Sequence, residues 1–99
     1  MTDEKTIAVF ENACNEAEEI FVDRNQRYGN AIVETGVQGA CIELVGCVAR
    51  LKQLVLKDPA HGADANYAIL RNILIDAHNY AVIAMMMQDQ NNFTGVDNE

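Results

Sequence analysis

Residues 64–88 read DANYAILRNILIDAHNYAVIAMMMQ, and this stretch decides the fold. Its apolar residues recur three and four positions apart, which is the spacing that gathers side chains on one face of an α-helix. That face contains Leu70, Ile73, Leu74, Ala77, Ala81, Ala84 and Met85. Asp64 or Asn66 is suited to cap the first turn, because either side chain accepts hydrogen bonds from free backbone N–H groups. We therefore predict a helix that begins near Asp64 or Asn66 and ends near Gln88.

A second helix is predicted near the beginning of the chain, from about Asp3 to Tyr28. One of its faces carries Ile7, Phe10, Cys14, Ala17 and Phe21, again three and four residues apart. Thr2 or Asp3 is suited to cap its first turn. Gly29 follows Tyr28, and a glycine directly after a helix supplies the positive φ that commonly ends one.

A third helix is predicted between these two, from about Gly36 to Leu56. Its apolar stripe consists of Val37, Cys41, Leu44, Val48, Leu51 and Val55, widened by Ala40, Val45, Cys47 and Leu54. Such a stripe is broader than a surface helix needs, so we expect two of its sides to be covered. Residues 57–59 read KDP and should stop the helix, because a residue before proline avoids the α conformation.

The whole chain has 99 residues, of which 49% are apolar, and no stretch alternates with the period of a β-strand. We expect one all-α domain over residues 1–99. It should be a helical bundle of three main helices plus a short C-terminal segment, with residues 88–99 as a loosely ordered polar tail. Because a small, apolar domain often continues its core across a subunit interface, we expect a homo-oligomer.

The charge and cysteine content narrow the class of protein. A formal net charge of -8 repels phosphate backbones, which disfavours a nucleic-acid partner. No apolar run approaches membrane-spanning length, and the acidic start is unlike a signal peptide. Three cysteines without a CxxC spacing are typical of reduced thiols. We expect a cytoplasmic protein with neither a nucleic-acid nor a membrane partner.

Asp76 is the acid whose surroundings call for an explanation. It lies between Ile75 and Ala77 on the helix of residues 64–88, and an unpaired buried carboxylate is costly. One interpretation is an ion pair with Arg50 that joins two helices. The other is that Asp76 and Glu43, with acids of the first helix, bind Mg²⁺, which prefers oxygen ligands.

The first helix is rich in acidic residues, namely Glu11, Glu16, Glu18, Glu19 and Asp23. Charge runs of this kind are usually a solvated face. A metal-binding alternative remains, because Glu16 with Glu19, or Glu19 with Asp23, is one helical turn apart and could bind one ion.

Several short motifs together resemble the nucleotide modification associated domain family. These are small proteins of phages and bacteria that are similar to the all-α MazG-type nucleoside triphosphate pyrophosphatases. The resemblance covers roughly residues 15 to 95. It is carried by Arg27-Tyr28-Gly29-Asn30-Ala31, Ile42-Glu43-Leu44-Val45-Gly46, Arg50-Leu51, Asp76-Ala77-His78-Asn79-Tyr80-Ala81 and Asn92-Phe93-Thr94-Gly95.

The resemblance implies a helical dimer or tetramer with a nucleotide between helices and acids that bind Mg²⁺. The motif positions imply Arg27, Tyr28, Arg50, Asn79 and Tyr80 as nucleotide or phosphate contacts. The metal candidates are Glu19, Glu43, Asp76 and Asn72. This chain departs from the active relatives at Asn72 and Ala68, where they tend to carry acids, and at Cys47, where a basic residue is expected.

Three functions follow as alternatives. The first is a Mg²⁺-dependent nucleoside triphosphate pyrophosphohydrolase. The second is a non-catalytic nucleotide-binding protein of phage or mobile-element type that sequesters or senses a nucleotide, which the missing acids favour. The third is an acidic helical module that binds a protein partner.

Overall fold

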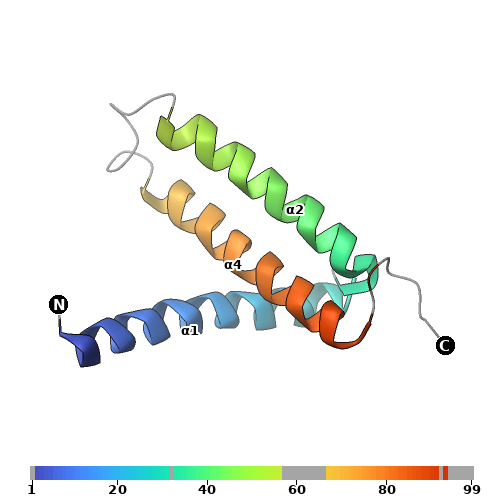
Figure 1. The fold of residues 1–99 in the computed structure, drawn as a ribbon, viewed down its shortest axis with the longest axis horizontal. Helices are drawn as coiled ribbons and strands as arrows, with labels where there is room; N and C mark the ends of the chain where they lie inside the picture. Colours follow the sequence, from blue (N-terminus) through green and yellow to red (C-terminus); the bar gives the residue numbers. More distant parts are fainter. Residues whose placement is uncertain (1, 32, 57–66, 92, 94–99) are drawn as a thin grey trace.

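Two antiparallel helices lie side by side, and a third crosses them near one end (Figure 1). The computed structural model describes residues 2–31, 33–56, 67–91 and 93. The helical elements are α1 (Asp3–Tyr28), the 3₁₀ turn η1 (Val33–Thr35), α2 (Gly36–Leu51), the π-helical turn η2 (Lys52–Leu56) and α4 (Tyr67–Asp89). The described residues contain no strand, which confirms the predicted all-α class. They also contain no helix that is both long and apolar enough to span a bilayer.

The bounds of α1 agree with the sequence prediction at both ends. The Thr2 hydroxyl accepts a hydrogen bond from the backbone N–H of Lys5 at 3.3 Å and so caps the first turn. At the other end Gly29 has φ +67°, a conformation that side-chain-bearing residues rarely adopt. The helix therefore ends for the reason that the sequence indicates.

The other helices differ from prediction in detail. The helix predicted to Leu56 is α-helical to Leu51 and continues as the π-helical η2. The predicted stop at residues 57–59 and the caps Asp64 and Asn66 lie outside the described residues. Helix α4 extends to Asp89. Beyond its end, the backbone carbonyl of Phe93 accepts a hydrogen bond from the backbone N–H of Gln38 in α2 at 2.9 Å.

The core lies where α2 and α4 pack, with α1 contributing at the crossing. Ala40, Ile83 and Met87 are buried together, and Phe21 and Tyr80 are among the half-buried side chains around them. The Cα radius of gyration is 15.5 Å, against about 13 Å for a folded domain of about 100 residues. Among the residues that the structure describes, only one side of α2 is covered, because Ile42 and Val45 on its outer side are 70% and 68% exposed.

We predict that the first turn of α2 requires a glycine at position 39, because a side chain there would collide with Thr35. A Cβ at this position would overlap the Cβ and Oγ1 of Thr35, atoms too close to the backbone to move aside. Gly39→Ala should therefore lower the free energy of unfolding by about 1–3 kcal/mol, as overpacking does. Gly46→Ala is the matched control, because its Cβ would meet only Arg50 Nη1 at 3.7 Å.

Urea unfolding followed by circular dichroism measures both variants. Gly46→Ala should gain up to about 1 kcal/mol from helix propensity alone. Equal gains in both variants would show that Thr35 does not limit the space at Gly39.

Candidate functional site

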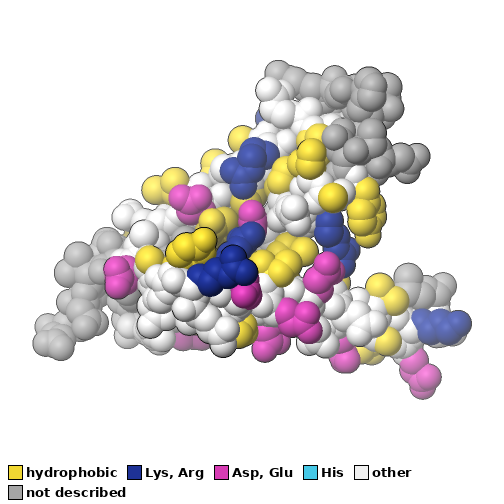
Figure 2. Space-filling view, turned by 180° about the vertical axis from the view of Figure 1, so that it is seen from behind, with side chains coloured by type: hydrophobic (Ala, Val, Ile, Leu, Met, Phe, Trp, Pro, Cys, Tyr) yellow, Lys and Arg dark blue, Asp and Glu magenta, His cyan; other side chains and the backbone are white. Residues whose placement is uncertain are grey.

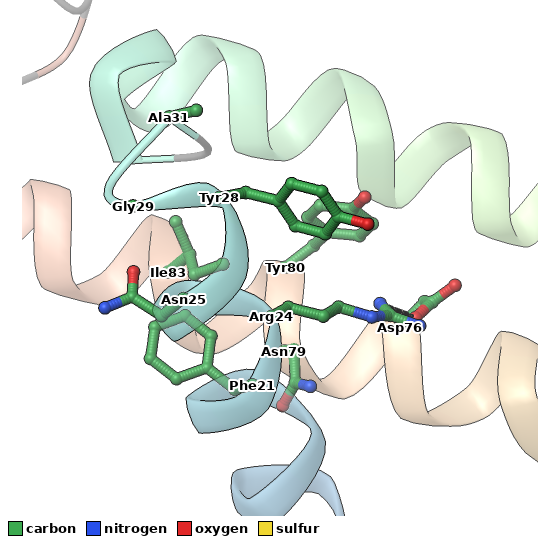
Figure 3. A pocket seen from close by; sticks show the side chains of 10 residues that line it. All are labelled: Phe21, Arg24, Asn25, Tyr28, Gly29, Ala31, Asp76, Asn79, Tyr80 and Ile83. Carbon is green, nitrogen blue, oxygen red and sulfur yellow. Dashed lines mark hydrogen bonds and ion pairs between the residues drawn. The ribbon is translucent and has the colours of Figure 1, made fainter.

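A cavity of about 320 Å³ opens between the C-terminal part of α1 and the middle of α4 (Figure 3). Its walls are mainly apolar and aromatic, with a few polar groups among them. The lining residues are Phe21, Arg24, Asn25, Tyr28, Gly29, Ala31, Asp76, Asn79, Tyr80 and Ile83. This volume and this mixture are typical of small-molecule sites, which combine apolar walls with a few placed polar groups.

The cavity exists because polar contacts hold α1 across α4. Arg71 donates from two guanidinium nitrogens to the Glu16 carboxylate. The Asn79 amide donates to the backbone carbonyl of Ala17 at 3.0 Å. The Arg24 guanidinium donates to Asp76 Oδ1 at 2.7 Å. The three pairs are Glu16–Arg71, Ala17–Asn79 and Arg24–Asp76, and together they fix where the helices cross.

Asp76 lies at the cavity with 23% of its side chain exposed. It points toward α1, as its place among apolar residues indicates. Its cationic partner among the described residues is Arg24, so the predicted pairing with Arg50 is wrong. The hydrogen bond from Arg24 to this carboxylate raises the pKa of the Arg24 guanidinium, which stays charged.

The amide of Asn79 is buried and makes hydrogen bonds through both its nitrogen and its oxygen. Its nitrogen donates to Ala17, so its oxygen is the atom that meets His78 Nδ1 at 2.9 Å. Because an amide oxygen only accepts, His78 carries a proton on Nδ1. Asn79 therefore joins the two helices through one N–H and its oxygen, and the second N–H of its amide is a candidate donor to a ligand in the cavity.

Asn25 presents the opposite situation. Its side-chain oxygen is buried and has no hydrogen-bond partner among the described residues. A buried polar atom without a partner costs about 1–3 kcal/mol, which a ligand donor could recover. Asn25 lines the cavity, so this oxygen is a candidate acceptor for an N–H or O–H of a bound molecule.

Negative charge from two helices acts on the tyrosine at the cavity. Burial, followed by the charges of Glu43 and Asp76, raises the pKa of the Tyr80 hydroxyl. Burial also raises the pKa of the Cys47 thiol, although Arg50 donates to its sulfur at 3.3 Å. Both groups are therefore protonated at neutral pH, and Cys47 is not poised as a nucleophile.

The predicted nucleotide contacts are only partly brought together. Tyr28, Asn79 and Tyr80 line the cavity. Arg27 does not, and pairs with Asp23 at 3.2 Å on the exposed side of α1. Arg50 lines a different hollow, between α2 and the start of α4.

The predicted metal ligands are dispersed. Glu19 lies with Glu18 and Asp23 along an open groove on the outer side of α1. Asn72 is exposed, one turn before Asp76 on α4. The negative charges of Glu43 and Asp76 both act on Tyr80, but of the two only Asp76 lines the cavity. The described residues hold no group of three or more Asp, Glu, His or Cys side chains placed to bind one metal ion.

Arg24 and Asn25 are site residues that the sequence analysis missed. Arg24 lies three residues after Phe21 and seven after Ala17, on the apolar face of α1. A cation on that face lies close to the neighbouring helix, and this position was the available signal for its pairing with Asp76. Nothing comparable in the sequence marks Asn25, because asparagine is common on exposed helix faces.

Comparison with protein-family models, with curated proteins and with solved structures gives no match for this chain.

Proposed function

We propose that this protein binds a nucleotide, with the base in the cavity between α1 and α4. The observation that carries the proposal is the combination of two tyrosines with an unpartnered buried acceptor in one cavity. Tyr28 and Tyr80 extend from different helices toward the side where Arg24 meets Asp76 (Figure 3). A planar heterocycle can stack on such rings. The Asn25 side chain extends on the opposite side from the tyrosine rings (Figure 3), so its oxygen can accept a hydrogen bond from another part of the bound molecule.

The charges near the cavity favour a nucleotide that arrives with a cation. Arg24 supplies one positive charge, but it is already paired with Asp76, and Glu43 adds a second negative charge nearby. Free phosphates would be repelled by two carboxylates. Mg²⁺ commonly binds through one or two carboxylates together with substrate phosphates and several waters. Glu43 and Asp76 could supply these one or two carboxylates, but they are too few to bind Mg²⁺ through protein ligands alone.

Pyrophosphohydrolysis is the second candidate function, and the negative charge that Glu43 and Asp76 exert on Tyr80 favours it. Bound Mg²⁺ would neutralise phosphate charge for attack by water. The chain's own part would be to orient the nucleotide, with Arg24 near the phosphates and Tyr80 as a hydrogen-bond donor. Asn72 and Ala68 offer no further charge, so we place binding before catalysis.

The proposal is tested by replacing one tyrosine of the cavity. Tyr28 is 70% exposed, so Tyr28→Ala should fold normally. Stacking on an aromatic side chain contributes about 1–3 kcal/mol per base, so nucleotide affinity should fall roughly 5- to 150-fold. Isothermal titration with ATP, GTP, CTP and UTP, each with Mg²⁺ and with EDTA, measures it.

Tyr67→Ala is the matched control, because Tyr67 is 65% exposed on α4 and does not line the cavity. It should bind as the unmodified protein does. If Tyr28→Ala also binds normally, or if no nucleotide binds, the base does not occupy this cavity. Pyrophosphate released in the same samples separates the catalytic candidate from simple binding.

A further inference from the structure

Helix α2 is apolar on both its inner and its outer side, and α4 covers only the inner one. On the inner side Ala40 and Cys47 are fully buried. On the outer side Ile42 and Val45 are 70% and 68% exposed. Hydrophobic side chains also gather along the outer edge of the arm that α2 and α4 form (Figure 2). The outer surface of α2 and η2, called the α2 seam here, consists of Cys41, Ile42, Val45, Val48, Ala49, Lys52, Val55 and Leu56.

The spacing within this seam matches a partner helix. Cys41, Val45, Val48 and Lys52 follow one another at intervals of four, three and four residues. Intervals of this kind form the contact line of two helices that pack side by side. An isolated surface helix needs no such line on its solvent side, so the pattern indicates a helical partner.

The exposed side chains of the seam indicate where that partner contact lies. Ile42, Val45 and Leu56 are 70%, 68% and 70% exposed, and Val48 and Val55 are 48% and 38% exposed. Apolar side chains that remain this exposed along one helix face are stabilised when an interface buries them.

We propose that the α2 seam packs against the α2 seam of a second copy of this chain. The core of one chain is small, so its stability gains from a partner that is always bound. A second copy of the chain meets this need, because it is present at the same concentration. Charge agrees with self-pairing. The only acid in residues 36–56 is Glu43, which acts on Tyr80 on the α4 side. In a chain of net charge -8 the seam is thus a surface on which two copies meet without opposing carboxylates.

The two seams run antiparallel in this dimer. A parallel pair would place the two Lys52 ammonium groups against each other. An antiparallel pair with full overlap of residues 41–56 places each Lys52 opposite Val45 of the other copy, where its long stem packs and its charge reaches water. The two-fold axis then passes close to Val48 and Ala49.

Sedimentation velocity of the full chain tests the proposal. The unmodified protein should sediment at twice the 10.9 kDa chain mass. Val45→Glu should sediment as a monomer, because it buries a carboxylate in the seam. Val9→Glu is the matched control, an identical exchange at a valine that is 57% exposed on α1. A monomeric unmodified protein, a dimeric Val45→Glu, or a monomeric Val9→Glu would overturn the proposal.

A cross-linking variant keeps the test decisive if Val45→Glu fails to fold. Val48→Cys in a Cys41→Ser background should form a disulfide-linked dimer on mild oxidation. Antiparallel overlap keeps the two Cys41 residues about 22 Å apart, beyond the roughly 7 Å that a disulfide allows. A Cys41–Cys41 disulfide in the unmodified protein, or no cross-link through Val48→Cys, would contradict this arrangement.

Discussion

Asn79→Asp is expected to lower the free energy of unfolding at neutral pH by about 3 kcal/mol. The substitution replaces a donor by a carboxylate at a buried position, directly against the backbone carbonyl of Ala17. It removes the hydrogen bond that joins the helices and places two acceptors face to face. For a chain of this size the melting temperature should fall by more than 10 °C, at about 4–8 °C per kcal/mol.

The pH dependence of this variant distinguishes charge burial from a packing defect. Burial raises the pKa of the new carboxyl group above its unfolded value. A group whose folded pKa is raised stabilises the fold at low pH and loses that contribution as pH rises. The deficit should therefore be smaller at mildly acidic pH than at neutral pH.

Asn72→Asp provides the control, since Asn72 lies two helical turns earlier on α4 and is exposed. It should change stability by no more than about 0.5 kcal/mol. Thermal and urea unfolding of both variants at several pH values give the comparison. A deficit for Asn79→Asp that does not vary with pH would mean that the introduced carboxylate finds a cationic partner.

Asp76→Asn is expected to abolish the Mg²⁺-dependent part of nucleotide binding. It removes one of the two negative charges that act on Tyr80, while the amide oxygen can still accept from Arg24. Losing a charged ligand of Mg²⁺ should weaken affinity in the presence of the ion at least tenfold, or by about 1.4 kcal/mol. Without Mg²⁺, affinity should be unchanged or higher, because less negative charge faces the phosphates.

Asp23→Asn is the control for this exchange. Asp23 also pairs with an arginine, Arg27, but on the exposed side of α1 away from the cavity. Titrations with and without Mg²⁺ should leave it indistinguishable from the unmodified protein. If Asp76→Asn binds and releases pyrophosphate normally, the carboxylate assignment is wrong even where the cavity proposal stands.

Local sequence patterns predicted the helices well. The cap at Thr2 and the glycine at position 29 determine both ends of α1, since each acts within one turn of the chain. The period of apolar residues likewise located α2 and α4. The predicted inward orientation of Asp76 agrees with the structure, in which its side chain is 23% exposed and pairs with Arg24 of α1.

Relations between helices were predicted poorly. Asp76 could pair with any arginine that the crossing brings near, and the crossing angle is set by contacts such as Asn79 with Ala17, 62 residues apart. Arg50 was the wrong candidate because α2 turns it toward the hollow beside Leu54. The four predicted metal ligands are dispersed for the same reason, since helix periodicity alone does not show that Glu19 lies along a different groove from Asp76.

Helix α1 is attached to the rest of the fold differently from the other two. It contacts α4 mainly around the crossing, whereas α2 packs along α4 over most of its length. Such an element can open as a separate cooperative unit while α2 and α4 stay paired. Because one wall of the cavity belongs to α1 and the other to α4, any occupant must resist this opening. Amide hydrogen exchange in α1 would then report occupancy directly, and saturating ligand would slow it in proportion to affinity.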